Sequence, residues 1–197
     1  IENNLRIVYC VRTNSQQKQV VHELQQFRKA GHSISVVAFQ GRGSLCPEQK
    51  YDKELKKSNW VEKSKICKSL KMQSKMGEAG CRFYRKLLQG SNSLVEQWSS
   101  DILTAEEFAE QVEDAGLCPY ELNKLMLKEA KVVIVPYVYF FEEFIRKFML
   151  GRMDTSLDKV IVIVDEAHNL PDWARSAASE SLTIETINRA VVESNTG

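Results

Sequence analysis

The chain has 197 residues, of which 43% are hydrophobic, enough for the core of one domain or of one domain with an insertion. Its net charge of +1 gives no overall sign of nucleic-acid binding. No stretch forms a signal peptide or reaches the roughly 18 apolar residues of a membrane span. Five cysteines without a secretory signal favour reduced thiols or metal ligands over a disulfide scaffold.

The first forty residues alternate predicted strands and helices. Residues 6–11 read as a short apolar strand, and an amphipathic helix follows to about Lys29, ended by Gly31. Residues 33–39 form a second predicted strand. This strand–helix–strand order is typical of α/β folds.

The start of that helix is a candidate anion site. Asn14 or Ser15 could cap it, and its unpaired N–H groups lie beside Arg12. Such a helix start can hold a phosphate, although an ordinary cap with a surface arginine has the same sequence.

Residues 41–130 depart from the strand–helix pattern, and residues 41–47 read as a loop. Between residues 42 and 86 there are 13 Lys and Arg against five acidic residues, with Trp60, Phe83 and Tyr84 interleaved. Basic charge with aromatic rings suits contact with single-stranded nucleic acid. A solvated lysine-rich helix face is the alternative interpretation.

Four cysteines are spread through this region: Cys46, Cys67, Cys81 and Cys118, separated by 20, 13 and 36 residues. No Cys-x-x-Cys pair occurs, so spacing alone favours scattered buried thiols over a metal site. Cys10 lies on the first strand and reads as a core residue.

The later elements return to the earlier alternation, and Thr104 opens a capping box with Glu107. The predicted elements are helices over 105–116, about 119–130 and 137–150, a strand over 131–136, a connector over 151–158, and a helix over 169–178 with Pro171 in its first turn.

Residues 160–164 are an unbroken β-branched run, which predicts a strand buried on both faces of a parallel sheet. Asp-Glu-Ala-His follows it and resembles the Walker B box of helicases. By that resemblance Asp165 holds the Mg²⁺ of a bound ATP and Glu166 orients the attacking water. His168 would couple hydrolysis to the nucleic-acid side. The alternative is a polar strand end that caps the next helix.

Five pieces in register resemble XPD-like (XPD/FANCJ) helicases over about residues 5–182. These are superfamily 2 DNA helicases with a 4Fe–4S cluster domain inserted in the first motor domain. The pieces are Tyr9-Cys10-x-Arg12-Thr13, Gly41-Arg42-x-x-Leu45-Cys46, Cys81-Arg82-Phe83-Tyr84, Cys118-Pro119-Tyr120 and Asp165-Glu166-Ala167-His168-Asn169.

The resemblance implies part of a RecA-like P-loop NTPase motor domain with a parallel sheet and an inserted helical and loop iron–sulfur domain. The motor domain would cover 1–40 and 131–182, the cluster domain 41–130, and an arch-like domain would begin at 183–197. The compact sequence suggests an archaeal, hence cytoplasmic, protein; a eukaryotic one would be nuclear.

The resemblance also implies site residues. Cys46, Cys67, Cys81 and Cys118 would ligate the cluster. DNA contacts would come from Arg12, Thr13, Asn14, Arg42, Arg82 and Tyr84, and Arg42 would also lie close to the cluster. Tyr137 and Tyr139 match an aromatic segment that serves in packing or in DNA contact.

The implied activity is ATP-driven 5′ to 3′ translocation on single-stranded DNA and unwinding of forks, without a membrane. Repair or transcription-complex proteins would be partners, in nucleotide excision repair for example. No Gly-x-x-x-x-Gly-Lys-Ser/Thr is present, so we expect a partial chain that is inactive alone. The alternatives are a non-motor iron–sulfur or zinc module that binds nucleic acid, and a degenerate motor domain that only docks proteins.

Overall fold

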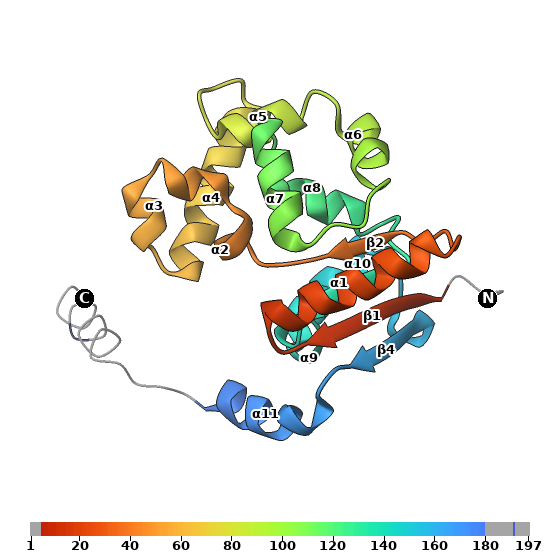
Figure 1. Ribbon diagram of the computed structural model, residues 1–197. Helices are drawn as coiled ribbons and strands as arrows, with labels where there is room; N and C mark the ends of the chain where they lie inside the picture. The colour runs from red at the N-terminus through yellow and green to blue at the C-terminus, as the bar shows by residue number, and fades with distance from the viewer. Residues whose placement is uncertain (1–4, 180–190, 192–197) are drawn as a thin grey trace. The chain divides into compact units, whose positions relative to one another are not determined.

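The computed structural model describes residues 5–179 and residue 191 (Figure 1). The chain divides into two compact units, residues 1–165 and residues 166–197. The first unit contains the sheet and the helices from α1 to α10, and the second contains α11. The predicted start of an arch-like domain at 183–197 lies outside the described residues, apart from residue 191.

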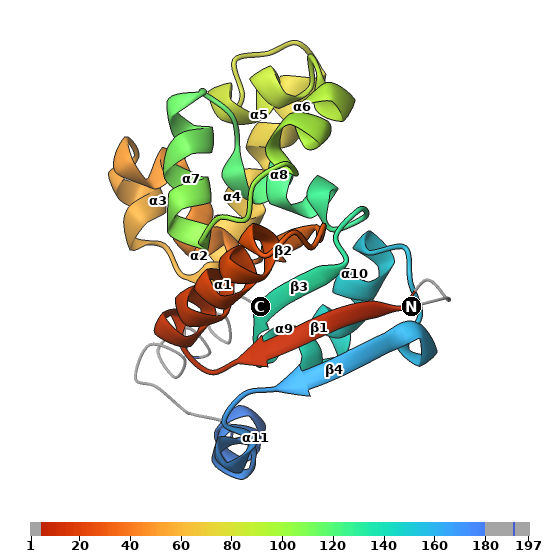
Figure 2. The same cartoon turned by 45° about the vertical axis from the view of Figure 1, so that its right-hand side comes forward.

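A four-stranded parallel sheet with the order β2-β3-β1-β4 forms the centre of the first unit (Figure 2). Its strands are β1 (Arg6–Val11), β2 (Val36–Ala38), β3 (Val132–Pro136) and β4 (Val160–Val164). The strands run in one direction, so their carboxyl ends lie at one edge, where open α/β sheets bind ligands. The predicted α/β class with a parallel sheet is therefore confirmed.

Helices cover this sheet on two faces. The connection from β1 to β2 and the connection from β3 to β4 run in opposite directions along the sheet. Because such connections are right-handed, their helices fall on opposite faces. Figure 2 shows α1 (Asn14–Lys29) in front of the sheet, and α9 (Val138–Phe141) and α10 (Glu143–Arg152) behind it.

A buried polar contact ties α1 to the sheet. The side-chain amide of Gln17, only 1% exposed, donates to the carbonyls of Phe39 at 3.1 Å and Ile134 at 2.9 Å. Gln40 in turn donates to the Gln17 side-chain oxygen at 2.8 Å. These bonds satisfy polar groups inside the core, and they fix the place where the chain leaves β2.

The region between β2 and β3 is a helical lobe, gathered in Figure 1 above the sheet. Buried apolar side chains from several of its helices form its interior, among them Leu55, Leu87, Phe108 and Leu122. The elements are α2 (Arg42–Leu45), η1 (Pro47–Lys50), α3 (Lys53–Lys57), α4 (Trp60–Lys75), α5 (Arg82–Leu87), α6 (Ser91–Trp98), α7 (Ala105–Asp114) and α8 (Pro119–Met126).

Several predicted boundaries differ from the structure. Residues 41–47 are not a loop, since α2 and the start of η1 occupy most of them. The strand expected over 33–39 is limited to β2. The helix expected over 137–150 is divided at Glu142, whose extended backbone separates α9 from α10, and α10 then continues into the expected connector.

The prediction that β4 is buried on both faces is wrong. Ile161 is 42% exposed and Ile163 is 39% exposed. The strand stands at the sheet edge among the described residues, paired with β1 on one side. Its β-branched composition predicted strand and parallel pairing correctly, but composition alone does not tell an edge position from a central one.

The second unit contains a short 3₁₀ turn, η3 (Ala167–Asn169), followed by α11 (Leu170–Ala178). Pro171 stands in the first turn of α11, as predicted, where the missing N–H costs nothing. None of the helices in the described part of the chain is long and apolar enough to span a membrane.

Candidate functional site

Asp165 follows β4 at the carboxyl edge of the sheet. Its backbone N–H donates to the carbonyl of Cys10 at 2.9 Å, and its own carbonyl accepts a bond from the hydroxyl of Tyr137. Burial, together with the negative charge of Asp165, raises the pKa of Tyr9. Hydrogen bonds therefore hold both the N–H and the carbonyl of the residue that carries this carboxylate.

In the second unit, the rest of the Asp-Glu-Ala-His sequence forms a tight turn. Glu166 has φ +50° and ψ +45°, a left-handed conformation that costs a non-glycine residue about 1–3 kcal/mol and is frequent at functional sites. Its carboxylate lies 3.1 Å from Nδ1 of His168, and its carbonyl accepts from the backbone N–H of Asn169 at 2.9 Å. Both paired side chains are open to solvent and thus reachable by a substrate.

The start of α1 carries the predicted phosphate contacts. The cap is Thr13, not Asn14 or Ser15: its hydroxyl accepts from Gln16 N–H at 3.2 Å, and the Gln16 side chain accepts from Thr13 N–H at 3.0 Å. The side chains of Arg12, Thr13 and Asn14 are exposed beside the N-terminus of this 16-residue helix. That arrangement favours an anion.

The four cysteines predicted as ligands come from four separate places in the lobe. Cys46 lies between α2 and η1, Cys67 lies within α4, and Cys81 and Cys118 immediately precede α5 and α8. All are free thiols. Cys10 is a fully buried core residue, as predicted, and burial raises the pKa of its thiol to about 12.

Burial and neighbouring charges raise the pKa values of the lobe thiols. Burial is the largest cause that raises the pKa of each, to about 11 for Cys46. The charges of Cys67 and Cys81 raise the pKa of Cys46 further, and those of Cys81 and Cys46 raise the pKa of Cys118. Hydrogen bonds from backbone N–H groups stabilise three of the thiolates and so lower their pKa values. The donors are Glu48 and Gln49 for Cys46, Phe83 and Tyr84 for Cys81, and Glu121 for Cys118.

The described residues include no group of three or more His, Cys, Asp or Glu side chains placed to hold a metal ion. They do include a buried donor without an acceptor. Nε of Arg42 is inaccessible to solvent and has no hydrogen-bond partner, and the charge of Arg42 stabilises the thiolate of Cys67. The guanidinium also lies over the ring of Tyr120, 4.9 Å from its centroid.

A buried ion cluster joins α4 to α8. Glu121 binds Lys71 at 2.8 Å and Lys124 at 2.7 Å, with side-chain exposures of 10%, 22% and 8%. Burial acts to raise the pKa of Glu121, but the charge and hydrogen bonds of the two lysines outweigh it and lower the pKa. Burial lowers the pKa of Lys124 despite this pairing. The charges of all three side chains also act on the Cys67 thiol.

Arg82 and Tyr84, both predicted DNA contacts, have different surroundings. Arg82 is exposed, stacked over Tyr51 at 4.0 Å, and its Nε lies 3.7 Å from Glu48. Tyr84 is only 9% exposed, and its neighbour Phe83 only 5%. The structure therefore puts Tyr84 in the lobe interior, where a nucleobase could not stack on it, because its helix turns that side inward.

An open cleft lies between the lobe and α10, with a volume of about 530 Å³. Trp60, 81% exposed, stands on the lobe side, and Phe144, 84% exposed, stands on the α10 side. Basic side chains accompany them. The lining also includes Arg42, Lys63, Tyr120, Tyr139 and Phe148.

Sequence reasoning singled out Trp60 but missed two features of this region. Phe144 falls in a predicted aromatic helix, and only its exposure distinguishes it from a core residue. The Lys71–Glu121–Lys124 cluster joins residues fifty positions apart, so the sequence carried no signal for it.

The comparisons agree with the geometry. The DEAD_2 family profile matches residues 9–187. The chain is 29% identical over 189 residues to "Regulator of telomere elongation helicase 1 homolog" of Caenorhabditis elegans, covering 95% of this chain and 18% of that protein. It is 28% identical over 178 residues to "Regulator of telomere elongation helicase 1" of Homo sapiens, covering 90% of this chain and 13% of that protein.

A solved structure titled "Truncated XPD" aligns with a TM-score of 0.51 at 21% identity, covering 84% of this chain and 41% of that one. This likeness confirms the fold of an XPD helicase motor domain. The profile match over most of the chain shows that it belongs to the DEAD_2 family.

Proposed function

We propose that this chain is the part of an ATP-dependent DNA helicase that extends from the DNA-contacting α1 to the Asp-Glu-Ala-His box. The observation that carries the proposal is that box, which follows the last strand of a parallel sheet in a DEAD_2 chain. The chain spans less than a fifth of its matched curated relatives, so the activity belongs to the intact protein. We expect that protein to move 5′ to 3′ along single-stranded DNA.

Asp165 would hold the Mg²⁺ of bound ATP, and Glu166 would orient the water that attacks it. Mg²⁺ suits one or two carboxylates together with phosphate oxygens, and it neutralises the charge that develops on those oxygens. His168 contacts the Glu166 carboxylate at 3.1 Å, so a change at either side chain would be felt by the other. This contact supports the role expected for His168, the coupling of hydrolysis to DNA.

A 4Fe–4S cluster held by Cys46, Cys67, Cys81 and Cys118 is the cofactor that we propose for the lobe. A single zinc ion would draw its four sulfurs to within about 4 Å of one another, because each Zn–S bond is ~2.3 Å long. A cluster places one thiolate on each iron, so its sulfurs stand further apart. An anionic cluster would also supply the acceptor that Arg42 Nε lacks. When bound, it would cross-link four elements of a lobe of short helices.

Single-stranded DNA is the polymer that suits the exposed surfaces of the first unit. The start of α1 would take a phosphate, and the rings of Trp60 and Phe144 would stack against bases, with Arg42 and Lys63 beside them. Base stacking on aromatic side chains tolerates any sequence, as a translocating motor requires. Fork DNA and repair or transcription-complex proteins would be partners, in the cytoplasm of an archaeon or the nucleus of a eukaryote.

The test uses the intact protein purified without oxygen. We expect brown protein with about four irons per chain, ATP hydrolysis stimulated by single-stranded DNA, and unwinding of forks with a 5′ tail rather than a 3′ tail. Stoichiometric zinc and no colour would replace the cluster proposal by a zinc lobe. Salt-sensitive DNA binding without any ATP hydrolysis would favour the non-motor alternative.

A further inference from the structure

Tyr137 joins three strand ends at the ligand-binding edge of the sheet. It directly follows β3, and its backbone N–H donates to the carbonyl of Val11, the last residue of β1, at 3.0 Å. Its hydroxyl donates to the carbonyl of Asp165, which follows β4. The side chain is 2% exposed and its ring packs edge-on against Phe141, so its position is fixed by the core.

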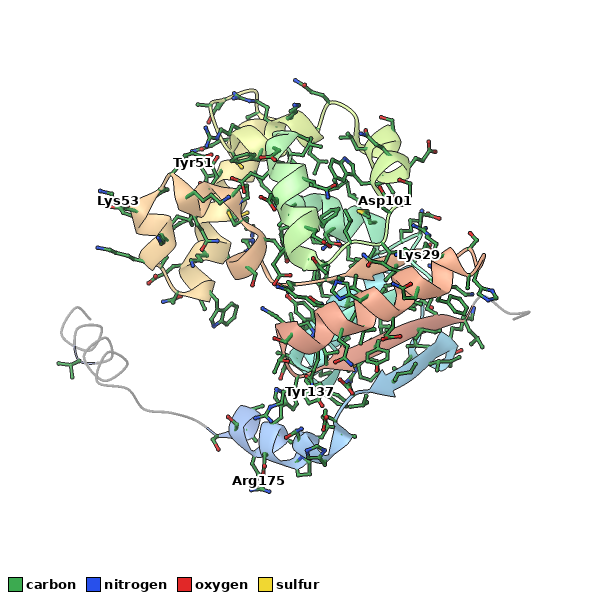
Figure 3. The ribbon with its side chains drawn as sticks, in the orientation of Figure 1. Lys29, Tyr51, Lys53, Asp101, Tyr137 and Arg175 are labelled. Atoms are coloured by element: carbon green, nitrogen blue, oxygen red, sulfur yellow. The ribbon has the colours of Figure 1, made fainter. Side chains whose placement is uncertain are left out.

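The contact reaches over a strand. β1 lies between β3 and β4 in the sheet, so the hydroxyl of Tyr137 reaches past β1 to the end of β4. Figure 3 labels Tyr137 near this edge of the sheet. The Asp165 peptide groups are thereby held from both sides, by Cys10 at the N–H and by Tyr137 at the carbonyl. The peptide groups before and after the Cα of Asp165 are therefore each fixed by a hydrogen bond, and together they set the position from which the Asp165 side chain extends.

We propose that Tyr137 is a positioning residue for the Asp165 carboxylate, acting through the backbone and touching neither metal nor nucleotide. The inference rests on the proposed role of Asp165 with Mg-ATP. Hydrogen bonds that orient ligating groups are worth about 10- to 100-fold in metal affinity or activity. Removing the Tyr137 hydroxyl leaves the Asp165 carbonyl without this donor and lets the strand end rotate.

The role separates Tyr137 from Tyr139, which the sequence placed in one aromatic segment. Tyr139 packs edge-on against Phe39 at 5.1 Å, and its hydroxyl faces Gly41 at the start of the lobe. It also lines the exposed cleft. Tyr137 therefore contacts the edge of the sheet where the nucleotide is proposed to bind, whereas Tyr139 packs at the junction between the sheet and the lobe.

The test compares Tyr137→Phe with Tyr139→Phe in the intact protein. For Tyr137→Phe we expect the Mg²⁺ concentration that half-saturates binding of a fluorescent ADP analogue to rise about 10-fold. The kcat for ATP should fall by a similar factor, with the Kd for single-stranded DNA unchanged. Tyr139→Phe should leave the Mg²⁺ concentration that half-saturates binding of the ADP analogue at the wild-type value.

Hydrogen exchange followed by mass spectrometry supplies a readout that is independent of activity. The peptide over residues 160–166 should exchange faster in Tyr137→Phe and at the wild-type rate in Tyr139→Phe. Unchanged exchange there, or an unchanged Mg²⁺ requirement, would overturn the positioning role even if kcat fell. A wild-type protein that does not hydrolyse ATP would instead refute the proposed function, whatever the exchange data show.

Discussion

Replacing Glu121 by Gln removes the only anion of the buried Lys71–Glu121–Lys124 cluster and leaves both lysines in place. Lys124 is 8% exposed and cannot reach water without disturbing α8, whereas Lys71, at 22%, can partly rehydrate. Breaking a buried pair in this way costs about 3–5 kcal/mol. Because one of the two cations finds water, we expect about 3 kcal/mol for Glu121→Gln.

Urea unfolding of this chain, followed by circular dichroism, measures the loss. With a slope of about 2 kcal/mol per molar urea, 3 kcal/mol lowers the midpoint by about 1.5 M. The matched control is Glu143→Gln, which removes the carboxylate of the exposed pair with Lys147, and its midpoint should not move measurably. A Glu121→Gln midpoint equal to that of the control would refute the argument.

The pH dependence follows from the lowered pKa of Glu121. A carboxyl group whose pKa is lower in the folded chain adds stability above its unfolded pKa and loses it as pH falls through the folded value. The difference in midpoint between wild type and Glu121→Gln should therefore be constant near neutral pH. Below about pH 4.5 it should shrink.

Three further changes test the proposed sites. Cys81→Ser should lower the iron content well below the wild-type value of about four per chain. Cys10→Ala, which lies outside the ligand set, should keep the wild-type iron content. Full iron and full unwinding in Cys81→Ser would exclude this ligand assignment. Glu166→Gln in the intact protein should bind ATP normally but hydrolyse it at least about 100-fold more slowly, as measured by phosphate release. Near-normal turnover would show that Glu166 does not activate the attacking water. Trp60→Ala should weaken single-stranded DNA binding by about 5- to 100-fold in a fluorescence titration. Met72→Ala, which changes an exposed side chain of the same helix, should leave DNA binding unchanged. Equal effects of the two changes would show that the cleft does not stack bases.

The sequence predicted the elements that have strong local signals. The β-branched runs of β3 and β4, the capping box at Thr104 and the glycine that ends α1 each depend on neighbouring residues. One prediction from neighbouring residues was wrong, because the N-cap of α1 is Thr13 and not Asn14 or Ser15. Thr13 forms a capping box with Gln16.

Features that depend on distant partners could not be predicted in the same way. The exposure of Ile161 depends on what packs against its face of β4, and the burial of Tyr84 depends on how α5 turns in the lobe. The hydroxyl contact of Tyr137 joins residues 28 positions apart. The ligand set came from resemblance, since spacing alone favoured scattered thiols, and it stays a prediction.

The lobe is also the only covalent route from β2 to β3, two strands that are hydrogen-bonded to each other. Their pairing therefore closes a loop over residues 39–131, and its entropic cost is small only while the lobe itself is compact. If iron cross-links the lobe, an oxidant that strips the metal would lengthen the flexible part of that loop. The three-residue strand β2, at the border of the sheet, would then be the first to detach, so oxidative damage to the lobe would reach the motor itself.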